Sequence, residues 1–268
     1  MILTIDVGNT NVVIGCVENG EVKSVCRLAT NLNDLSSDYA LKMRQSFEFD
    51  GIDYKNFAGA ILSSVVPQLN RSIRSAVKKV TGLDCMVVGA GLKTGVNVKI
   101  DDPGTLAGDL ITGAVGALAM FKPPIIVVDM GTATTIVAID KDGAYTGGAI
   151  VPGIKLSYTA LSSGTSLLPN IAIEAPAKCI GTNTVDSMKS GAVYGAAALV
   201  DGMIDRMEEE LGETVTVVAT GGLAGTVVPH CKRKIEYEPA LLLKGLAILY
   251  EKNAKRRKQQ TKIKAVNP

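Results

Sequence analysis

Apolar and polar positions in the first half of the chain form short β-branched runs that alternate with amphipathic segments. Short or alternating apolar runs predict strands, and apolar positions three to four residues apart predict helices. Pro67 stands where proline suits the first turn of a helix. The expected elements are two strands around a turn after Asp6, a strand over 21–28, a helix near 35–47, a strand over 59–63 and a helix near 67–80.

The second half repeats this order of elements. Strand hairpins followed by alternating helices and strands predict a mixed sheet that is covered by helices, so the fold class is α/β. The expected elements are a hairpin arm over 144–150, helical segments from 154 and over 185–211, a strand over 214–219 and a last helix from near Pro239.

Two segments about half a chain apart share one pattern. Residues 3–14 and 126–137 each contain an apolar strand, then Asp-x-Gly, then small hydroxyl or amide residues and a second β-branched strand. Because the pattern occurs only twice, it indicates duplication of a domain rather than a solenoid. With the chain breaker at 121–124 as the boundary, we expect two similar α/β domains facing across a cleft. The predicted divisions are 1–121, 122–250 and a basic tail over 251–268.

Composition and charge narrow the function classes. Hydrophobic residues make up 47% and charged residues 20% of the chain, which is typical of a globular protein. The aromatic content of 4% and the lack of Trp argue against a stacking surface for nucleic acid. The net charge of +2 combines +6 in the tail with −4 in the rest, and we interpret the tail as a solvated terminal helix.

Cysteine spacing and the first residues of the chain bear on the cellular compartment. The five cysteines are scattered and form no CxxC pair, so neither a zinc site nor a disulfide framework is indicated. The chain starts without a basic segment, and no apolar run approaches the roughly 20 residues that span a bilayer. We therefore expect a cytoplasmic protein without a membrane partner.

The repeated hairpins have the chemistry of a phosphate site. A tight strand–turn–strand with Gly8 at its apex offers backbone N–H donors and room for close approach. Asp6 would repel a phosphate, so it is placed to hold Mg²⁺ through water while the ion bridges to the phosphates. The second hairpin, 129–135, can hold the other side of the same polyphosphate. A single turn of this kind is ordinarily a simple β-turn, but two at strand ends favour phosphate binding.

Two further motifs are each only a weak indication of a functional site when taken alone. Gly221 and Gly222 follow the apolar strand 215–219, and glycines at the carboxyl end of a strand let a flat ligand such as adenosine pack on the backbone. Asp109 precedes an Ala- and Gly-rich helix. It is either a cap of that helix or the general base that accepts a proton during phosphoryl transfer, and residue type leaves both roles open.

The single histidine, His230, follows Pro229 in an expected loop without a supporting motif. A Ser-His-Asp or Cys-His apparatus is therefore not indicated. Any acid–base chemistry falls to carboxylates.

The order of these motifs resembles type III pantothenate kinase, and the resemblance runs from Met1 to about Tyr250. Each piece is short, but their order and spacing are specific. The matching pieces are Asp6–Thr10, Gly108–Asp109, Asp129–Thr134, Gly147–Gly153, Leu167–Pro169, Gly181–Thr184, Thr220–Gly222 and Gly245–Leu246.

The resemblance implies ATP-dependent phosphorylation of pantothenate to 4'-phosphopantothenate, the first step of coenzyme A biosynthesis. It implies two duplicated ribonuclease-H-like (actin-like) domains, each a mixed sheet flanked by helices, with a cleft between them. It also implies a homodimer with the substrate site at or near the subunit interface. The implied cofactors are ATP with Mg²⁺ and a monovalent cation, K⁺ or NH₄⁺. Nucleic acid is not an expected partner.

The resemblance also assigns roles to individual positions. Asp109 is implied as the proton acceptor, Asp129 as the ligand of the monovalent cation, and Asp6 as the residue that holds Mg²⁺ through water. The implied ATP-binding residues are Asp6, Val7, Gly8, Asn9, Thr10, Asn11, Val12, Val13 and Thr132. The implied substrate-binding residues are Ala107, Gly108, Asp109, Leu110 and Thr184.

Three positions depart from the family pattern. Leu110 replaces a common Arg, Gly113 a common Asn and Ile100 a common Tyr. The missing Arg removes a fixed donor suited to the pantothenate carboxylate. Two alternatives follow: a catalytically silent, nucleotide-binding regulatory or accessory protein of the same fold, and a kinase for another small hydroxylated acceptor.

Overall fold

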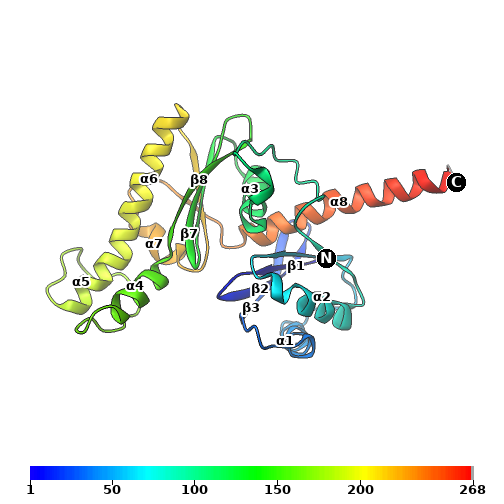
Figure 1. Ribbon diagram of the computed structural model, residues 1–268, viewed down its shortest axis with the longest axis horizontal. Coiled ribbons are helices and arrows are strands. Elements are labelled where there is room, and N and C mark those ends of the chain that lie inside the picture. Colours follow the sequence, from blue (N-terminus) through cyan, green and yellow to red (C-terminus); the bar gives the residue numbers. More distant parts are fainter. Residues whose placement is uncertain (267–268) are drawn as a thin grey trace. The chain divides into compact units, whose positions relative to one another are not determined.

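Two five-stranded β-sheets organise the chain in the computed structural model (Figure 1). The structure describes the backbone of residues 1–266 and the side chains of residues 1–254. Unit 1 contains residues 1–96, 104–119 and the chain from 240 onward, and unit 2 contains residues 97–103 and 120–239. Each unit has its own sheet and its own apolar core.

The sheet of unit 1 has the strand order β3-β2-β1-β4-β5. Strand β1 pairs antiparallel with β2 and parallel with β4, while β3 and β5 form the two edges. The strands are β1 (Ile2–Val7), β2 (Asn11–Glu18), β3 (Glu21–Ala29), β4 (Gly59–Ser64) and β5 (Cys85–Val87).

Successive side chains of a strand point to opposite faces, and in unit 1 both faces are covered. One face packs on α1 (Ser36–Phe49) and α2 (Pro67–Thr81), where Leu3 and Ile5 join Tyr39, Met43 and Ile73. The other face packs on α3 (Gly108–Met120) and α8 (Leu241–Val266), as Figure 1 shows. Ile2 and Ile61 contact Val115 of α3 and Leu246 of α8 on this second face.

Helices α3 and α8 touch through glycines. A Cβ atom on Gly116 would lie 2.6 Å from the carbonyl oxygen of Leu241, and one on Gly245 would lie 2.2 Å from that of Thr112. Only residues without a side chain allow this approach of the two backbones. The glycine contact sets how α3, which carries Asp109 in its first turn, lies on the sheet.

The last helix belongs to unit 1, whereas the predicted division placed it in the second domain with residues 122–250. Leu246 and Leu249 of α8 are fully buried beside Ile2 and Ile61. The side-chain amide of Asn253 also donates to the carbonyl of Lys93 and accepts from its N–H, both at 3.0 Å. Burial of these leucines against the first sheet is the reason that the chain returns to unit 1.

The predicted basic tail, 251–268, continues α8 without a break as far as Val266. Residues 267–268 and the side chains from 255 onward lie outside the described part of the structure. Among the described residues, no helix is long and apolar enough to span a bilayer.

The sheet of unit 2 repeats the topology of unit 1. Its order is β10-β9-β6-β7-β8, with β6 antiparallel to β7 and parallel to β9. The duplication predicted from the sequence is therefore present strand for strand. The strands are β6 (Ile125–Met130), β7 (Ala133–Ile139), β8 (Tyr145–Pro152), β9 (Thr216–Thr220) and β10 (Glu236–Tyr237).

Helices cover the face of the second sheet that carries Ile126 and Val128. The expected helix over 185–211 is instead two α-helices joined by one π-helical turn, η2, which begins at Gly191. The remaining elements are α4 (Ile154–Ser163), α5 (Thr184–Ser190), η2 (Gly191–Gly195), α6 (Ala196–Leu211), α7 (Ala224–Val227), η1 (Pro103–Thr105) and η3 (Val228–His230).

Candidate active site

The first aspartate hairpin joins β1 to β2. Val7 pairs with Val12, which leaves the four residues Gly8–Asn11 as the turn. The N–H of Gly8 donates to the carbonyl of Asn11 at 2.9 Å and closes this turn. Asn9, Thr10 and Asn11 are exposed, whereas Val7 and Val12 are buried in the core and offer a ligand only their backbone.

Thr30, just beyond β3, holds this turn from the side. Its N–H donates to the carbonyl of Thr10 at 3.0 Å, and its hydroxyl donates to the carbonyl of Gly8 at 2.6 Å. Two carbonyls of the turn are thereby occupied. The backbone N–H groups at the tip remain the natural donors for an anion.

The second aspartate hairpin joins β6 to β7 and is one residue shorter. Met130 pairs with Thr134, so the turn is Gly131–Ala133, and the N–H of Gly131 donates to the carbonyl of Ala133 at 3.0 Å. Thr132 at its tip is exposed. Asp129 occupies the same strand position in β6 that Asp6 occupies in β1, two residues before the glycine.

Two glycines from elsewhere in unit 2 pack against this second hairpin. A Cβ on Gly153 would lie 2.4 Å from the carbonyl oxygens of Gly131 and Thr132, and the N–H of Gly153 donates to Thr132 at 3.0 Å. Gly221 has φ +95°, and a Cβ there would lie 2.5 Å from Oδ1 of Asp129. The space at Gly221, which we expected to receive a flat ligand, is thus taken by the hairpin itself.

Asp109 lies in the first turn of α3 and is half-buried. Its Oδ1 accepts a hydrogen bond from the N–H of Leu110 at 2.8 Å. Burial raises the pKa of Asp109, and the backbone hydrogen bonds to its carboxylate offset part of this rise. The two roles that the sequence left open are therefore compatible, because a carboxylate that binds the helix terminus also has the raised pKa of a general base.

Asp6 and Asp109 are brought to the same side of the sheet of unit 1. Asp6 is the register partner of Ser63 on β4, so both side chains lie on one face. The first residue of α3, Gly108, packs on that face, since a Cβ there would lie 3.1 Å from Oγ of Ser63. Ala107 and Leu110, on either side of Gly108 and Asp109, are half-buried.

The predicted substrate residue Thr184 is the exposed first residue of α5 in unit 2. Asn183 caps this helix: its Oδ1 accepts from the N–H of Asp186 at 2.9 Å, and its amide donates to the Asp186 carboxylate at 2.8 Å. A Cβ on Gly181 would lie 2.4 Å from the backbone nitrogen of Ser187. The motif around Thr184 therefore folds as a tightly packed helix start.

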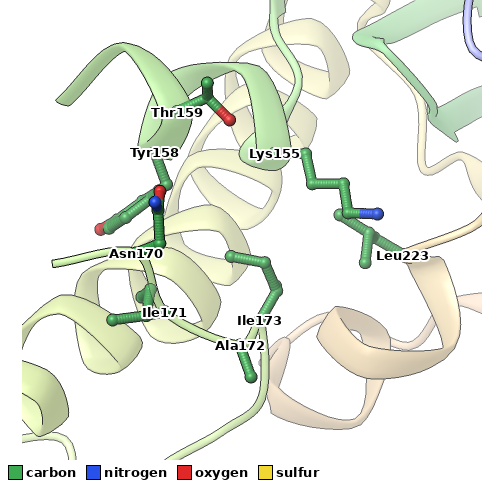
Figure 2. A pocket seen from close by; sticks show the side chains of 8 residues that line it. All are labelled: Lys155, Tyr158, Thr159, Asn170, Ile171, Ala172, Ile173 and Leu223. Carbon is green, nitrogen blue, oxygen red and sulfur yellow. The ribbon is translucent and has the colours of Figure 1, made fainter. Parts of the chain in front are cut away.

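A cavity of about 340 Å³ lies in unit 2 between α4, the segment after it and the start of α7. Ile171, Ile173 and Leu223 supply apolar walls, and Lys155 and Tyr158 come from α4 (Figure 2). The N–H of Leu223 donates to the carbonyl of Met130 at 3.4 Å, so one wall is attached to the second hairpin. The sequence pointed to Gly221–Gly222 but missed this cavity, because its walls come from three separate segments.

The candidate ligands for a metal ion are single carboxylates rather than a cluster of side chains. Within the described residues, no three His, Cys, Asp or Glu side chains gather as a ligand set. Mg²⁺ ordinarily keeps several waters and uses one or two protein carboxylates together with substrate phosphates. Asp6, at the carboxyl end of β1 beside the turn, is a single carboxylate of this kind.

His230 packs edge-on against Tyr194 with ring centroids 5.0 Å apart.

Comparison with solved structures gives the fold. A protein described as a Baf family transcriptional activator from Campylobacter jejuni has a TM-score of 0.58 and 18% identity, over 94% of this chain and 99% of that one. Component A of (R)-2-hydroxyglutaryl-CoA dehydratase from Acidaminococcus fermentans has a TM-score of 0.54 and 17% identity, over 93% and 96%. The fold is the duplicated actin-like α/β fold that was expected.

Comparison of sequences gives the family. The family model described as type III pantothenate kinase matches residues 2–206, a span that contains both hairpins, Asp109 and Thr184. A protein from Moorella thermoacetica named type III pantothenate kinase is 40% identical over 253 residues, which are 94% of this chain and 100% of that protein. The chain belongs to the type III pantothenate kinase family.

Proposed function

We infer that the protein transfers the γ-phosphoryl group of ATP to the hydroxyl of pantothenate, giving 4'-phosphopantothenate for coenzyme A biosynthesis. Family membership over residues 2–206 supports this activity. The observation that carries the mechanism is the half-buried Asp109, with a raised pKa, on the same face of unit 1 as Asp6. These carboxylates have the environments that a proton acceptor and a metal-holding group need.

The nucleotide phosphates bind to backbone N–H groups of the two hairpins. Residues 6–13 form the first contact and Thr132 the second. Asp6 would hold Mg²⁺ through water, and a bound ion would supply positive charge beside the phosphate oxygens. The turn at Gly8 suits this role because Thr30 occupies its carbonyls and leaves its tip exposed.

The adenosine part of ATP binds in the cavity beside Leu223. Its volume of about 340 Å³ lies within the usual range for small-molecule sites, and Ile171 and Ile173 offer apolar walls to a base. Lys155 lines the cavity, and its ammonium group can donate a hydrogen bond to a phosphate or ribose oxygen (Figure 2). The hydrogen bond from Leu223 to Met130 connects the cavity wall with the second phosphate hairpin.

Asp109 accepts the proton of the acceptor hydroxyl. As the hydroxyl oxygen forms its bond to the γ-phosphorus, the bond from that phosphorus to the β–γ bridging oxygen breaks and ADP leaves. The proton moves to the Asp109 carboxylate, whose raised pKa improves its basicity. Ala107, Gly108, Leu110 and Thr184 form the substrate contacts.

Asp129 binds a monovalent cation, K⁺ or NH₄⁺. The hairpin at Asp129 offers a carboxylate, and its turn has backbone carbonyl oxygens; such oxygens can coordinate K⁺ or accept hydrogen bonds from NH₄⁺. The enzyme acts in the cytoplasm as a homodimer. Exposed apolar side chains of unit 2 support dimer formation through that unit, since they would otherwise face water. They are Ile150, Leu156, Leu161, Leu167, Ile180, Val185 and Leu199.

A coupled assay that follows ADP release tests this function. Purified protein with ATP, Mg²⁺ and pantothenate should turn over, and K⁺ or NH₄⁺ should raise the rate above that in Na⁺. A panel of other small hydroxylated acceptors, run in parallel, tests the departures at Leu110 and Ile100. Absence of pantothenate turnover from protein with a cooperative melting transition would overturn the proposal, and faster turnover of another acceptor would change the substrate.

A further inference from the structure

Ser63 carries a buried hydroxyl in the sheet of unit 1. It lies near the carboxyl end of β4, and its relative exposure is 0%. Among the residues that the structure describes, its Oγ has no hydrogen-bond partner. Folded proteins satisfy nearly all such groups, because a buried hydroxyl without a partner destabilises the native state.

The position of Ser63 connects it to the two candidate carboxylates, Asp6 and Asp109. Ser63 is the direct register partner of Asp6 across the parallel β1–β4 pair. Its Oγ also points to the first turn of α3, since it lies 3.1 Å from where a Cβ on Gly108 would stand. Asp109 is the next residue of that turn. The hydroxyl therefore lies between the strand that carries Asp6 and the helix start that carries Asp109.

A second buried hydroxyl on the same face, that of Thr4, has a structural role because it is hydrogen-bonded within the protein. Thr4 lies two residues before Asp6, is fully buried, and donates from Oγ1 to the carbonyl of Gly15 at 3.1 Å. This face of the sheet can thus satisfy a hydroxyl within the protein. Among the described residues Ser63 has no such partner on this face, so its hydroxyl can donate to a group that comes within reach in another state.

The duplicated unit places a hydroxyl at the equivalent position. In the parallel β6–β9 pair the register partner of Asp129 is Thr220, whose exposure is 2%. Both units therefore set a buried hydroxyl residue beside the aspartate of the phosphate hairpin. Apolar side chains fill most other buried positions of these strands, so the recurrence points to a requirement of the site.

We propose that Ser63 is a positioning residue for the kinase reaction: when substrates are bound, its hydroxyl donates a hydrogen bond to the Asp109 carboxylate and holds it toward the acceptor. This proposal rests on the proposed function. A donor to the carboxylate favours its charged form, the form that accepts a proton. The hydrogen bond also opposes the burial that raises the pKa of Asp109, and Asp6 is a second carboxylate on this face.

Ser63→Ala tests the proposal in the full-length enzyme. We expect kcat at neutral pH to fall at least tenfold, while the KM for ATP stays within twofold. The acidic limb of the kcat–pH profile should move to higher pH by about one unit, because loss of a donor to the carboxylate raises its pKa. The melting temperature should stay the same or rise, since the variant removes an unsatisfied hydroxyl.

Two further variants separate positioning from packing. Ser63→Thr keeps the hydroxyl and copies the residue that unit 2 uses at this position, so it should recover most of kcat and the original pH limb. Thr4→Val removes the satisfied hydroxyl of the same face, so it should lower the melting temperature and leave kcat within twofold.

The outcomes decide between the two proposals. If wild-type enzyme turns over pantothenate and Ser63→Ala keeps both its kcat and its pH limb, Ser63 has no positioning role. A lowered melting temperature with unchanged kcat in Ser63→Ala would assign it to packing. If the wild type itself does not turn over, the proposed function fails and the role of Ser63 fails with it.

Discussion

The two aspartate hairpins share one topology but are held in different ways. In unit 1, the four-residue turn at Gly8 is held by two hydrogen bonds from Thr30. In unit 2, the three-residue turn at Thr132 is enclosed by the backbones of Gly153 and Gly221. Hydrogen bonds to a turn can stretch or reform, whereas a close glycine contact admits no added atom. The two units therefore share the strand order but differ in the contacts that hold each turn.

The chemistry of the two units also differs. On the α3 side of its sheet, unit 1 gathers Asp6, Ser63 and Asp109. Unit 2 offers a cavity with apolar walls and an exposed helix start at Thr184. The proposed acid–base groups and most of the proposed substrate contacts thus belong to unit 1, and the proposed nucleoside contacts and Thr184 belong to unit 2. Variants that separate these contributions sharpen the comparison.

Asp109→Asn has the largest expected effect. The amide keeps the size of the side chain but cannot accept the proton, so kcat should fall by about 10³-fold, within the usual range for a general base. The KM for ATP should stay within twofold, as measured in the coupled assay. Asp101→Asn, the same change at an exposed aspartate, is the control and should be silent. Equal losses in kcat and nucleotide affinity would assign Asp109 to structure.

The raised pKa of Asp109 also predicts the direction of a stability change. The folded state holds this proton more tightly than the unfolded chain, so Asp109 lowers stability as the pH rises from about 4 through the raised pKa. At neutral pH, Asp109→Asn should therefore melt at a higher temperature than the wild type. The difference should shrink in acid, and a lower melting temperature at pH 7 would contradict the raised pKa.

Gly153→Ala comes next, because it tests the glycine contact of the second hairpin. The new Cβ would meet two carbonyl oxygens at 2.4 Å, so the turn must move. The KM for ATP should rise at least tenfold and the melting temperature should fall, measured by assay and by calorimetry. Gly195→Ala, where a Cβ has nothing within 4 Å, is the matched control in the same unit. Two variants with the same ATP affinity would show that the contact is dispensable.

Leu110→Arg tests the departure from the family pattern in unit 1. A guanidinium next to Asp109 supplies a charge-assisted donor for the pantothenate carboxylate, a gain of about 1.5–3 kcal/mol. The KM for pantothenate should fall about tenfold with little change in kcat. Leu110→Met keeps an apolar side chain and should behave as the wild type. An unchanged KM in the Arg variant would place the substrate carboxylate elsewhere.

Thr30→Val tests the hydrogen-bonded support of the first hairpin. It removes the hydroxyl that donates to the carbonyl of Gly8 but keeps the backbone N–H bond to Thr10. One neutral hydrogen bond contributes about 1 kcal/mol, so the KM for ATP should rise about fivefold. Thr81→Val removes a hydroxyl of the same unit that donates to the carbonyl of Val77 and accepts from the N–H of Leu83, and it should leave the KM unchanged. A Thr30 effect as large as that of Gly153→Ala would erase the proposed difference between the hairpins.

Lys155→Ala has the smallest expected effect. Lys155 is exposed at the mouth of the cavity, so its contact with the nucleotide is screened by water. The KM for ATP should rise about threefold, with unchanged kcat. Lys178→Ala removes an exposed lysine of the same unit and serves as the control. An equal KM for the two variants would remove the nucleotide from this cavity.

The strands and helices were largely predictable because their signals are local. Strand β4 and helix α2 were expected within one residue of their observed bounds, since a short apolar run marks the strand and Pro67 marks the start of the helix. Strands β5 and β10 were missed: they have three and two residues, too few for a periodic pattern. The π-helical turn at Gly191 was also missed, because the helical period on both sides of it is nearly continuous.

The sequence by itself determined the duplicated Asp-x-Gly strands, the α/β class, the likeness to a kinase family and Asp109 as a candidate, since each depends on neighbouring residues or motif order. Tertiary structure alone decided that α8 returns to the first sheet, that Gly153 and Gly221 enclose the second hairpin, and that Ser63 lies between Asp6 and the start of α3. The physical reason is that burial and close contact depend on which distant segments meet. No local pattern around Ser63 shows that its hydroxyl is buried without a partner in the described part of the chain.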